Sequence, residues 1–444
     1  MDVLKTLAEF TADLRYADIP NKTIEFSKEI LSKQVAGMVA GSTCPPTKQF
    51  ANIVRSQRLP EDVGVIGCGF KTTLWESVLL NGFSCHNSEL EDVQHTRGES
   101  WDCTVIPLLV PLAQKLRMSG KALLTAITAG MEVHSRINFA FGADEYGYCM
   151  PITNGMGPAA GAAKAYGLDA KRTLSAMGFA LSSVNESTAN LGTDAHFFES
   201  ALQCLGPLIG TELAREGQTS KPDLKFYHPF VLKNRSIDKI NDGLGKKWLF
   251  MDQWIKKYPV YFGMHRHLDA LAELMKEHKF TYDQVELIEA HISPMDLCAD
   301  NPEPQTDGAV RFSFQNSMGA LLLDGEINMA NHNLDAAFEP KYKKARAKVK
   351  LIVHPDYSKT EYMVDPAEVV VRLKGGKKFS KVRNILKGHP DEPLTAKEFK
   401  DLYRIFTRGV LSEAQIDRSM ALIWNLEELN DIDELMNIIT FGGQ

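Results

Sequence analysis

Apolar residues recur at the spacing of an α-helix through most of the first 270 residues. Near the N-terminus, for example, Leu4, Leu7 and Phe10 fall on one face of a helix. The same periodicity predicts helices over residues 3–14, 24–39, 47–56, 72–84, 104–116, 120–140, 155–166, 170–182 and 199–215. Several of these segments are rich in Ala, Gly and Ser, whose small side chains allow helices to approach closely, so we expect a compact helical bundle.

The pattern changes after about residue 270, where short β-rich segments begin. Strands are predicted over residues 284–292, 348–354, 367–373 and 378–382. Gly375 and Gly376 separate the last two strands and supply the positive φ angles of a tight hairpin turn. Helices are predicted over residues 315–323, 397–406 and 413–426.

These patterns predict a mainly α protein with a large all-helical domain and a smaller α+β domain. The helical domain is assigned to residues 1–270 and the α+β domain to residues 271–398. Residues 399–444 are expected to form C-terminal helices that return to the helical domain.

Composition and charge narrow the class of protein. The chain has 444 residues and a net charge of −6, with 50 Lys and Arg against 56 Asp and Glu, so it lacks the basic excess that nucleic-acid binding requires. It has no apolar run long enough for a transmembrane helix, and its first residues do not resemble a secretory signal. Its seven cysteines form no CxxC pair, which favours free thiols and a reducing cytoplasm.

The densest polar segment covers residues 86–100 and combines several acids with His86, His95 and Arg97. Neighbouring charges of this kind shift pKa values toward neutrality, which suits general acid–base catalysis. A solvated charged loop is the structural alternative. The segment has no HExxH motif or comparable ligand spacing, so no metal site and no cofactor are predicted.

Two further polar segments are candidate sites. Residues 262–270 contain His265 and Arg266 just before the change of pattern, and ligands often bind between domains. Residues 192–200 place His196 in a loop rich in Gly and Thr, although neither phosphate-binding glycine motif is present. A GxSxG elbow is also absent, so a serine hydrolase is not indicated. Surface histidines and a plain loop remain the structural alternatives.

Taken in order, several segments resemble the MmgE/PrpD family, which contains dehydratases, decarboxylases and epimerases. They are residues 80–95 (LNGFSCHNSELEDVQH), 105–114, 161–182, 191–197 (LGTDAHF), 256–270 (KKYPVYFGMHRHLDA), 311–325 and 387–395. The resemblance implies a large helical domain, a smaller α+β lid domain and an active site in the cleft between them. It also implies a homodimer that usually needs no cofactor, and chemistry at a carbon beside a carboxylate.

Carried over residue by residue, the resemblance places His86 and Asp92 on the family's helix that ends in an acidic pair. It places Lys256 near the lysine before a Tyr-Pro motif and His265 on the histidine after it.

The chain also departs from the family pattern. Val93 takes the place of a threonine, Glu199 that of a histidine, and Asn316 lies near the position of a tyrosine. Two expected His-Pro pairs, near residues 100–102 and near Tyr148, lack their histidine. The residues found there can still hold or move protons, which favours a rebuilt site over a lost activity.

The resulting hypothesis is a cofactor-independent lyase, of dehydratase or decarboxylase type, that acts on a small carboxylate-bearing substrate. The residues expected to transfer protons are Asp92, His95, His196 and Tyr148. The residues expected to hold the substrate are His86, Arg97, Lys256, His265, Arg266 and Asn316. An epimerase of a small amino or imino dicarboxylate, a non-catalytic ligand-binding protein and a metal-dependent hydrolase are the alternatives.

Overall fold

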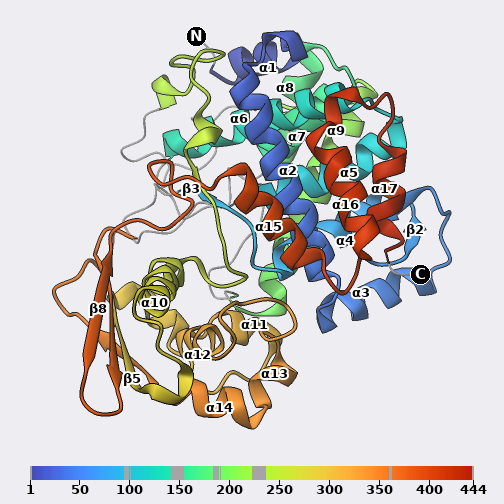
Figure 1. The fold of residues 1–444 in the computed structure, drawn as a ribbon. Helices are drawn as coiled ribbons and strands as arrows, with labels where there is room; N and C mark the ends of the chain where they lie inside the picture. The colour runs from blue at the N-terminus through green and yellow to red at the C-terminus, as the bar shows by residue number, and fades with distance from the viewer. Residues whose placement is uncertain are drawn as a thin grey trace.

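The computed structural model describes residues 3–94, 100, 102–141, 155–183, 190, 192–222, 237–359 and 363–442. Helices dominate it, and the small sheets belong mostly to a mixed α/β part, which confirms the predicted fold class (Figure 1). The helices of the N-terminal part are α1 (Val3–Asp13), α2 (Asn21–Gly41), α3 (Pro45–Ser56), α4 (Leu74–Asn87), α5 (Asp102–Leu116), α6 (Gly120–Phe141), α7 (Met156–Ala165), α8 (Ala170–Ala180) and α9 (Asp194–Arg215).

Helix α2 is the central element of this part. Its second half, residues 30–41, is buried throughout. It packs against α4 and also against α15 (Ala396–Thr407) and α16 (Glu413–Trp424), so the end of the chain lies beside its beginning (Figure 1). A third C-terminal helix, α17 (Asp433–Thr440), follows. These helices share one hydrophobic core in which Val35, Leu109 and Tyr403 are fully buried.

A second hydrophobic core lies in the mixed part of the chain. The four-stranded sheet has the order β6-β5-β7-β8, with β5 (Val285–Ile292) parallel to β6 (Val349–Val353) and antiparallel to β7 (Ala367–Leu373). Helices α10 (His265–His278) and α12 (Phe314–Asp324) pack against this sheet. Leu271, Ile288 and Phe314 fill the space between them.

The predicted hairpin is confirmed. β7 pairs with β8 (Lys378–Arg383) in antiparallel register, and Gly375 and Gly376 in the turn have φ angles of 100° and 89°. Side chains with a β-carbon rarely adopt such angles, so the two glycines determine where the chain reverses.

Some elements differ from the prediction. Helix α9 begins at Asp194 rather than at residue 199, with an acidic side chain in its first turn, where the helix dipole favours one. The sequence pattern does not predict α10 or α17, nor the short helices. The short helices are α11 (Asp307–Arg311), α13 (Leu334–Phe338) and α14 (Pro340–Arg346). Segments of five to seven residues contain too few turns to show a helical period.

A small two-stranded hairpin, formed by β1 (Val63–Val65) and β2 (Phe70–Thr72), precedes α4. The six cysteines that the structure describes are free thiols, as expected, and Cys149 lies outside the described residues. Within the described ranges, every helix is too short or too polar to cross a lipid bilayer.

The predicted domain boundary after residue 270 falls inside α10 and stays a prediction.

Candidate active site

A pair of two-residue strands brings the acidic segment after α4 against the segment before α10. β3 (Val93–Gln94) pairs antiparallel with β4 (Gln253–Trp254), which places Asp92 beside Lys256. The backbone N–H of Lys256 donates a hydrogen bond of 2.7 Å to Oδ1 of Asp92. Two residues that the sequence predicts for the site therefore meet although 164 positions separate them.

Asp92 forms one half of a buried cluster with Lys33 and Asp102. The ammonium group of Lys33, from the buried half of α2, forms an ion pair with Oδ1 of Asp92, and neither side chain is more than 2% exposed. The N–H of Asp92 donates to the carboxylate of Asp102 at 3.1 and 3.2 Å. Burial raises the pKa of Asp102 well above its ordinary value, and the charge of Asp92 raises it further. Both effects favour the protonated form of Asp102.

Lys256 forms the other half of the cluster with Glu89 and Glu91. Its ammonium group lies 3.0 Å from Oε2 of Glu89 and 2.5 Å from Oε1 of Glu91. Burial alone would lower the pKa of Lys256, but the two carboxylates raise it above its ordinary value. Burial, together with the charge of Glu89, raises the pKa of Glu91 to about 7. Glu91 can therefore gain or lose a proton near neutral pH.

His86 and His196 lie against each other beside these acids. Their ring centroids are 4.4 Å apart, His86 coming from the end of α4 and His196 from the first turn of α9. Nε2 of His86 is 3.9 Å from Oε1 of Glu91, and Nδ1 of His196 is 3.6 Å from Oε2 of Glu199. Burial, with the neighbouring His196 and Lys256, holds the pKa of His86 well below its ordinary value, so its ring is neutral at pH 7.

His265 begins α10 and is fully buried between the rings of Tyr258 and Phe262, whose centroids lie 5.5 and 5.6 Å away. Burial, followed by the charges of Lys256 and Lys33, lowers its pKa well below the ordinary histidine value. His265 is therefore neutral at pH 7, and it lies close enough to both lysines for their charges to lower its pKa.

The other predicted residues are held elsewhere or lie outside the described ranges. Arg266 donates hydrogen bonds to the backbone carbonyls of Met363 and Asn384 at 3.1 and 3.3 Å. Asn316 contacts His332 at 3.3 Å, within the mixed part of the chain. The structure thus brings together Asp92, Lys256, His86 and His196, with His265 nearby. His95, Arg97 and Tyr148 lie outside the described residues.

Four members of the cluster are missing from the sequence-based list of site residues, namely Lys33, Glu89, Glu91 and Asp102, although Glu89 and Glu91 belong to the polar segment 86–100. Lys33 lies in α2 between the polar residues Ser32 and Gln34, with Leu31 and Val35 beyond them. This polar setting gives no sign in the sequence that the lysine is buried, and its burial becomes clear only from its partner Asp92. Asp102, at the first position of α5, likewise shows no local signal.

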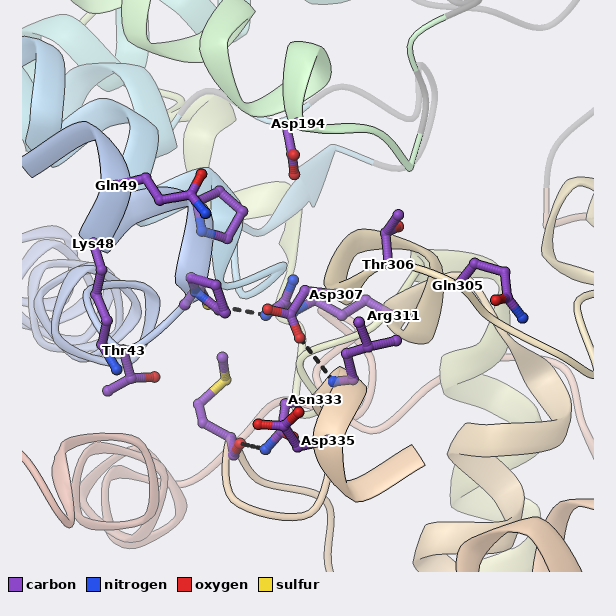
Figure 2. A pocket seen from close by; sticks show the side chains of 15 residues that line it. Thr43, Lys48, Gln49, Asp194, Gln305, Thr306, Asp307, Arg311, Asn333 and Asp335 are labelled. Atoms are coloured by element: carbon purple, nitrogen blue, oxygen red, sulfur yellow. Dashed lines mark hydrogen bonds between the residues drawn. The ribbon is translucent and has the colours of Figure 1, made fainter. Parts of the chain in front are cut away.

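A cavity of about 470 Å³ lies between the start of α3 and helices α11 and α13 (Figure 2). Figure 2 shows Asp194 pointing toward Asp307 across the space. Arg311 is fully buried and donates hydrogen bonds to Asn87 Oδ1 at 3.3 Å and to the sulfur of Cys44 at 2.9 Å. Asn87 follows His86 in the chain and Asp194 precedes His196 by two residues, but neither histidine is among the described residues that line the cavity.

Comparisons with known proteins identify the family of the chain. Residues 5–226 match the MmgE/PrpD N-terminal domain, and residues 258–427 match the MmgE/PrpD C-terminal domain. The human cis-aconitate decarboxylase is 25% identical over 385 residues, which cover 82% of this chain and 79% of that protein. The mouse cis-aconitate decarboxylase is 24% identical over 382 residues, with 82% and 78% covered. The chain belongs to the MmgE/PrpD family.

Proposed function

We propose that this protein is a lyase that removes water or carbon dioxide from a small carboxylate-bearing substrate by proton transfer. Membership in the MmgE/PrpD family and the similarity to two cis-aconitate decarboxylases support a lyase of the dehydratase or decarboxylase type. The finer assignment, to proton transfer at Asp92, rests on the buried cluster described above.

The observation that carries the proposal is the unequal pair of Asp92 and Asp102. Lys33 and the N–H of Lys256 occupy Oδ1 of Asp92, while its Oδ2 is buried and accepts no hydrogen bond from a described residue. The raised pKa of the neighbouring Asp102 favours its protonated form. A protonated carboxyl group beside a carboxylate that is paired with a lysine can divide the roles of acid and base with it. We assign proton abstraction to Asp92 and proton storage to Asp102.

Negative charge that develops on the substrate needs a cation nearby, because a proton on a carbon beside a carboxylate is only weakly acidic. Lys256 is the candidate. When Glu91 takes up a proton, which its pKa of about 7 allows, Lys256 keeps only Glu89 as an ionised partner. Its ammonium group is then available to a substrate carboxylate. His265 is proposed to contact the same substrate as a neutral hydrogen-bonding ring.

The test is turnover of cis-aconitate and of a panel of small di- and tricarboxylates, followed by proton NMR in deuterated buffer. Asp92→Asn and Lys256→Met are expected to lower kcat by roughly 100-fold or more, the usual contribution of a positioned proton-transfer group. Asp18→Asn and Lys5→Met make the same chemical changes on the surface and are the matched controls.

Other outcomes would replace the proposal. Deuterium entering the substrate without loss of water or carbon dioxide would identify an epimerase. Binding without turnover across the whole panel would identify a non-catalytic ligand-binding member of the family. Equal activity of Asp92→Asn and the surface control Asp18→Asn would remove Asp92 from the chemistry.

We also propose that the protein forms a homodimer, as the family resemblance implies. Large apolar side chains are exposed on α3 and α9, where Ile53, Phe198 and Leu202 are 59%, 42% and 36% exposed. Sedimentation measures the oligomeric state directly. A dimer that becomes a monomer in Phe198→Glu is the expected result, and a monomeric wild-type protein would contradict the proposal.

A further inference from the structure

Three side chains from distant positions meet in an arrangement suited to a metal ion. His86 ends α4, Glu89 follows it, and His196 lies in the first turn of α9. One ligand atom from each lies within 4.8 Å of the other two. Ligands bonded to one ion at about 2.1 Å stand up to about 4.2 Å apart, so a small closure would complete the site.

A carboxylate stands behind each histidine. Oε2 of Glu199 lies 3.6 Å from Nδ1 of His196, and Oε1 of Glu91 lies 3.9 Å from Nε2 of His86. Histidines that bind metals usually present their other ring nitrogen to such a group, which orients the ring and strengthens it as a ligand. With Nε2 of His86 directed at Glu91, Nδ1 is the ring nitrogen of His86 that can bind an ion. His196 offers one ring nitrogen within the same distance limit. Nδ1 of His86 is buried and bonded to no described residue.

Glu89 contributes the third ligand. Its Oε2 is occupied by Lys256, but its Oε1 is buried and bonded to no described residue, and the side chain is only 3% exposed. Its backbone has a positive φ of 55°, which residues with a β-carbon rarely adopt. Burying a carboxylate oxygen without a partner raises the free energy of the folded protein, and a bound cation would lower it.

The charges of the cluster also leave room for a cation. Among the described residues, four buried carboxyl groups face two buried ammonium groups. The carboxyl groups belong to Glu89, Glu91, Asp92 and Asp102, and the ammonium groups to Lys33 and Lys256. With the proton that its raised pKa favours on Asp102, an excess of one negative charge remains when the other three are ionised, and a cation would balance it.

We propose that His86, Glu89 and His196 bind a divalent first-row transition-metal ion such as Zn²⁺. Two imidazoles and a carboxylate suit such an ion and leave coordination positions open for a substrate carboxylate. The binding site stands on its own geometry, whereas its use in holding substrate rests on the proposed lyase activity. The inference gives His196 the role of a ligand in place of the proton transfer that the sequence predicts.

The experiment measures metal binding by the full-length protein after chelator treatment. Titration with ZnCl₂ is expected to show one ion per chain. His86→Ala, Glu89→Gln and His196→Ala should abolish or strongly weaken binding, and Glu199→Gln should weaken it about 10- to 100-fold through the orientation of His196. His278→Ala, which changes an exposed histidine, is the matched control and should bind like the wild type.

A second measurement does not depend on the stability of the variants. X-ray absorption of the zinc-loaded wild type should show histidine scattering at about 2.0–2.1 Å. Absence of that signal, failure of the folded wild type to bind zinc, or unchanged binding in His196→Ala would each overturn the site.

Activity separates this inference from the proposed function. Full turnover by a zinc-free protein that also fails to bind zinc would leave the lyase standing and remove the metal. Stoichiometric zinc binding that depends on His86 and His196, with no turnover of any carboxylate, would support the metal site and contradict the proposed lyase activity.

Discussion

Replacing His332 with asparagine is expected to make the protein less sensitive to acid. His332 is fully buried, and its ring nitrogens lie 3.3 Å from Asn316 and from Ser317. Burial, helped by the charge of Arg311, lowers its pKa to about 3. In the unfolded chain a histidine titrates at about 6.5. The folded protein therefore keeps this ring neutral over a pH range in which the unfolded chain takes up a proton.

The sign and size of the effect follow from this difference. A lowered pKa in the folded state stabilises the fold above the unfolded pKa, and that stability is lost as the pH falls. Integrated from pH 7 to pH 5, one such histidine removes about 2 kcal/mol from the free energy of unfolding. His332→Asn lacks the titrating group, so its free energy of unfolding should fall by about 2 kcal/mol less over the same range.

Urea denaturation at pH 7, 6 and 5, followed by tryptophan fluorescence, measures the difference. Groups common to both proteins cancel in the comparison. The matched control is His278→Asn, an exposed histidine stacked on Phe379, and it should follow the wild-type pH dependence. Parallel pH dependences for the wild type and His332→Asn would refute the reasoning, because His332 would then have the same pKa in both states.

Two further predictions concern the packing of α2. Lys33→Met should lower the free energy of unfolding by roughly 3–5 kcal/mol, because it leaves the buried Asp92 without its ion-pair partner. Urea denaturation measures the loss, and a loss below about 1 kcal/mol would contradict a buried pair. Gly41→Ala places a β-carbon 1.8 Å from the carbonyl oxygen of Ser84 and should lower the free energy of unfolding by roughly 1–3 kcal/mol or more. In Gly37→Ala, in the same helix, the nearest atom to the new β-carbon is the movable side-chain oxygen of Ser88 at 3.2 Å, so the loss in the same assay should be clearly smaller.

The sequence predicts the fold class and most long elements because their patterns are local. Helices α2, α6 and α8 show their own periodicity, and the hairpin of β7 and β8 is marked by two glycines. Helix α9 extends further toward its N-terminus than the pattern predicts, since the helical period becomes visible only after its first turn. Helices of five to seven residues and strands of two or three residues carry too little pattern to be recognised and depend on their neighbours.

The candidate site shows where local reasoning ends. The segment around residues 86–92 and Lys256 are recognisable from residue types and from family resemblance, and the structure brings them together. Their contact depends on β3 and β4, a pair of two-residue strands that no sequence pattern predicts. Arg266 is predicted from its segment to bind substrate. In the structure, however, its guanidinium group donates hydrogen bonds to backbone carbonyls in the mixed part of the chain.

The departures from the family pattern acquire a physical meaning once the cluster is seen whole. The resemblance places a basic residue at position 196 and a histidine at position 199, where this chain has His196 and Glu199. A histidine offers a nitrogen lone pair, and Glu199 lies 3.6 Å behind it, where it can orient the ring. These two positions thus add a ligand and a supporting carboxylate beside His86 and Glu89, in a cluster that already carries more negative than positive groups. Under the proposed metal site, these two replacements are what would allow the cluster of this chain to hold a cation.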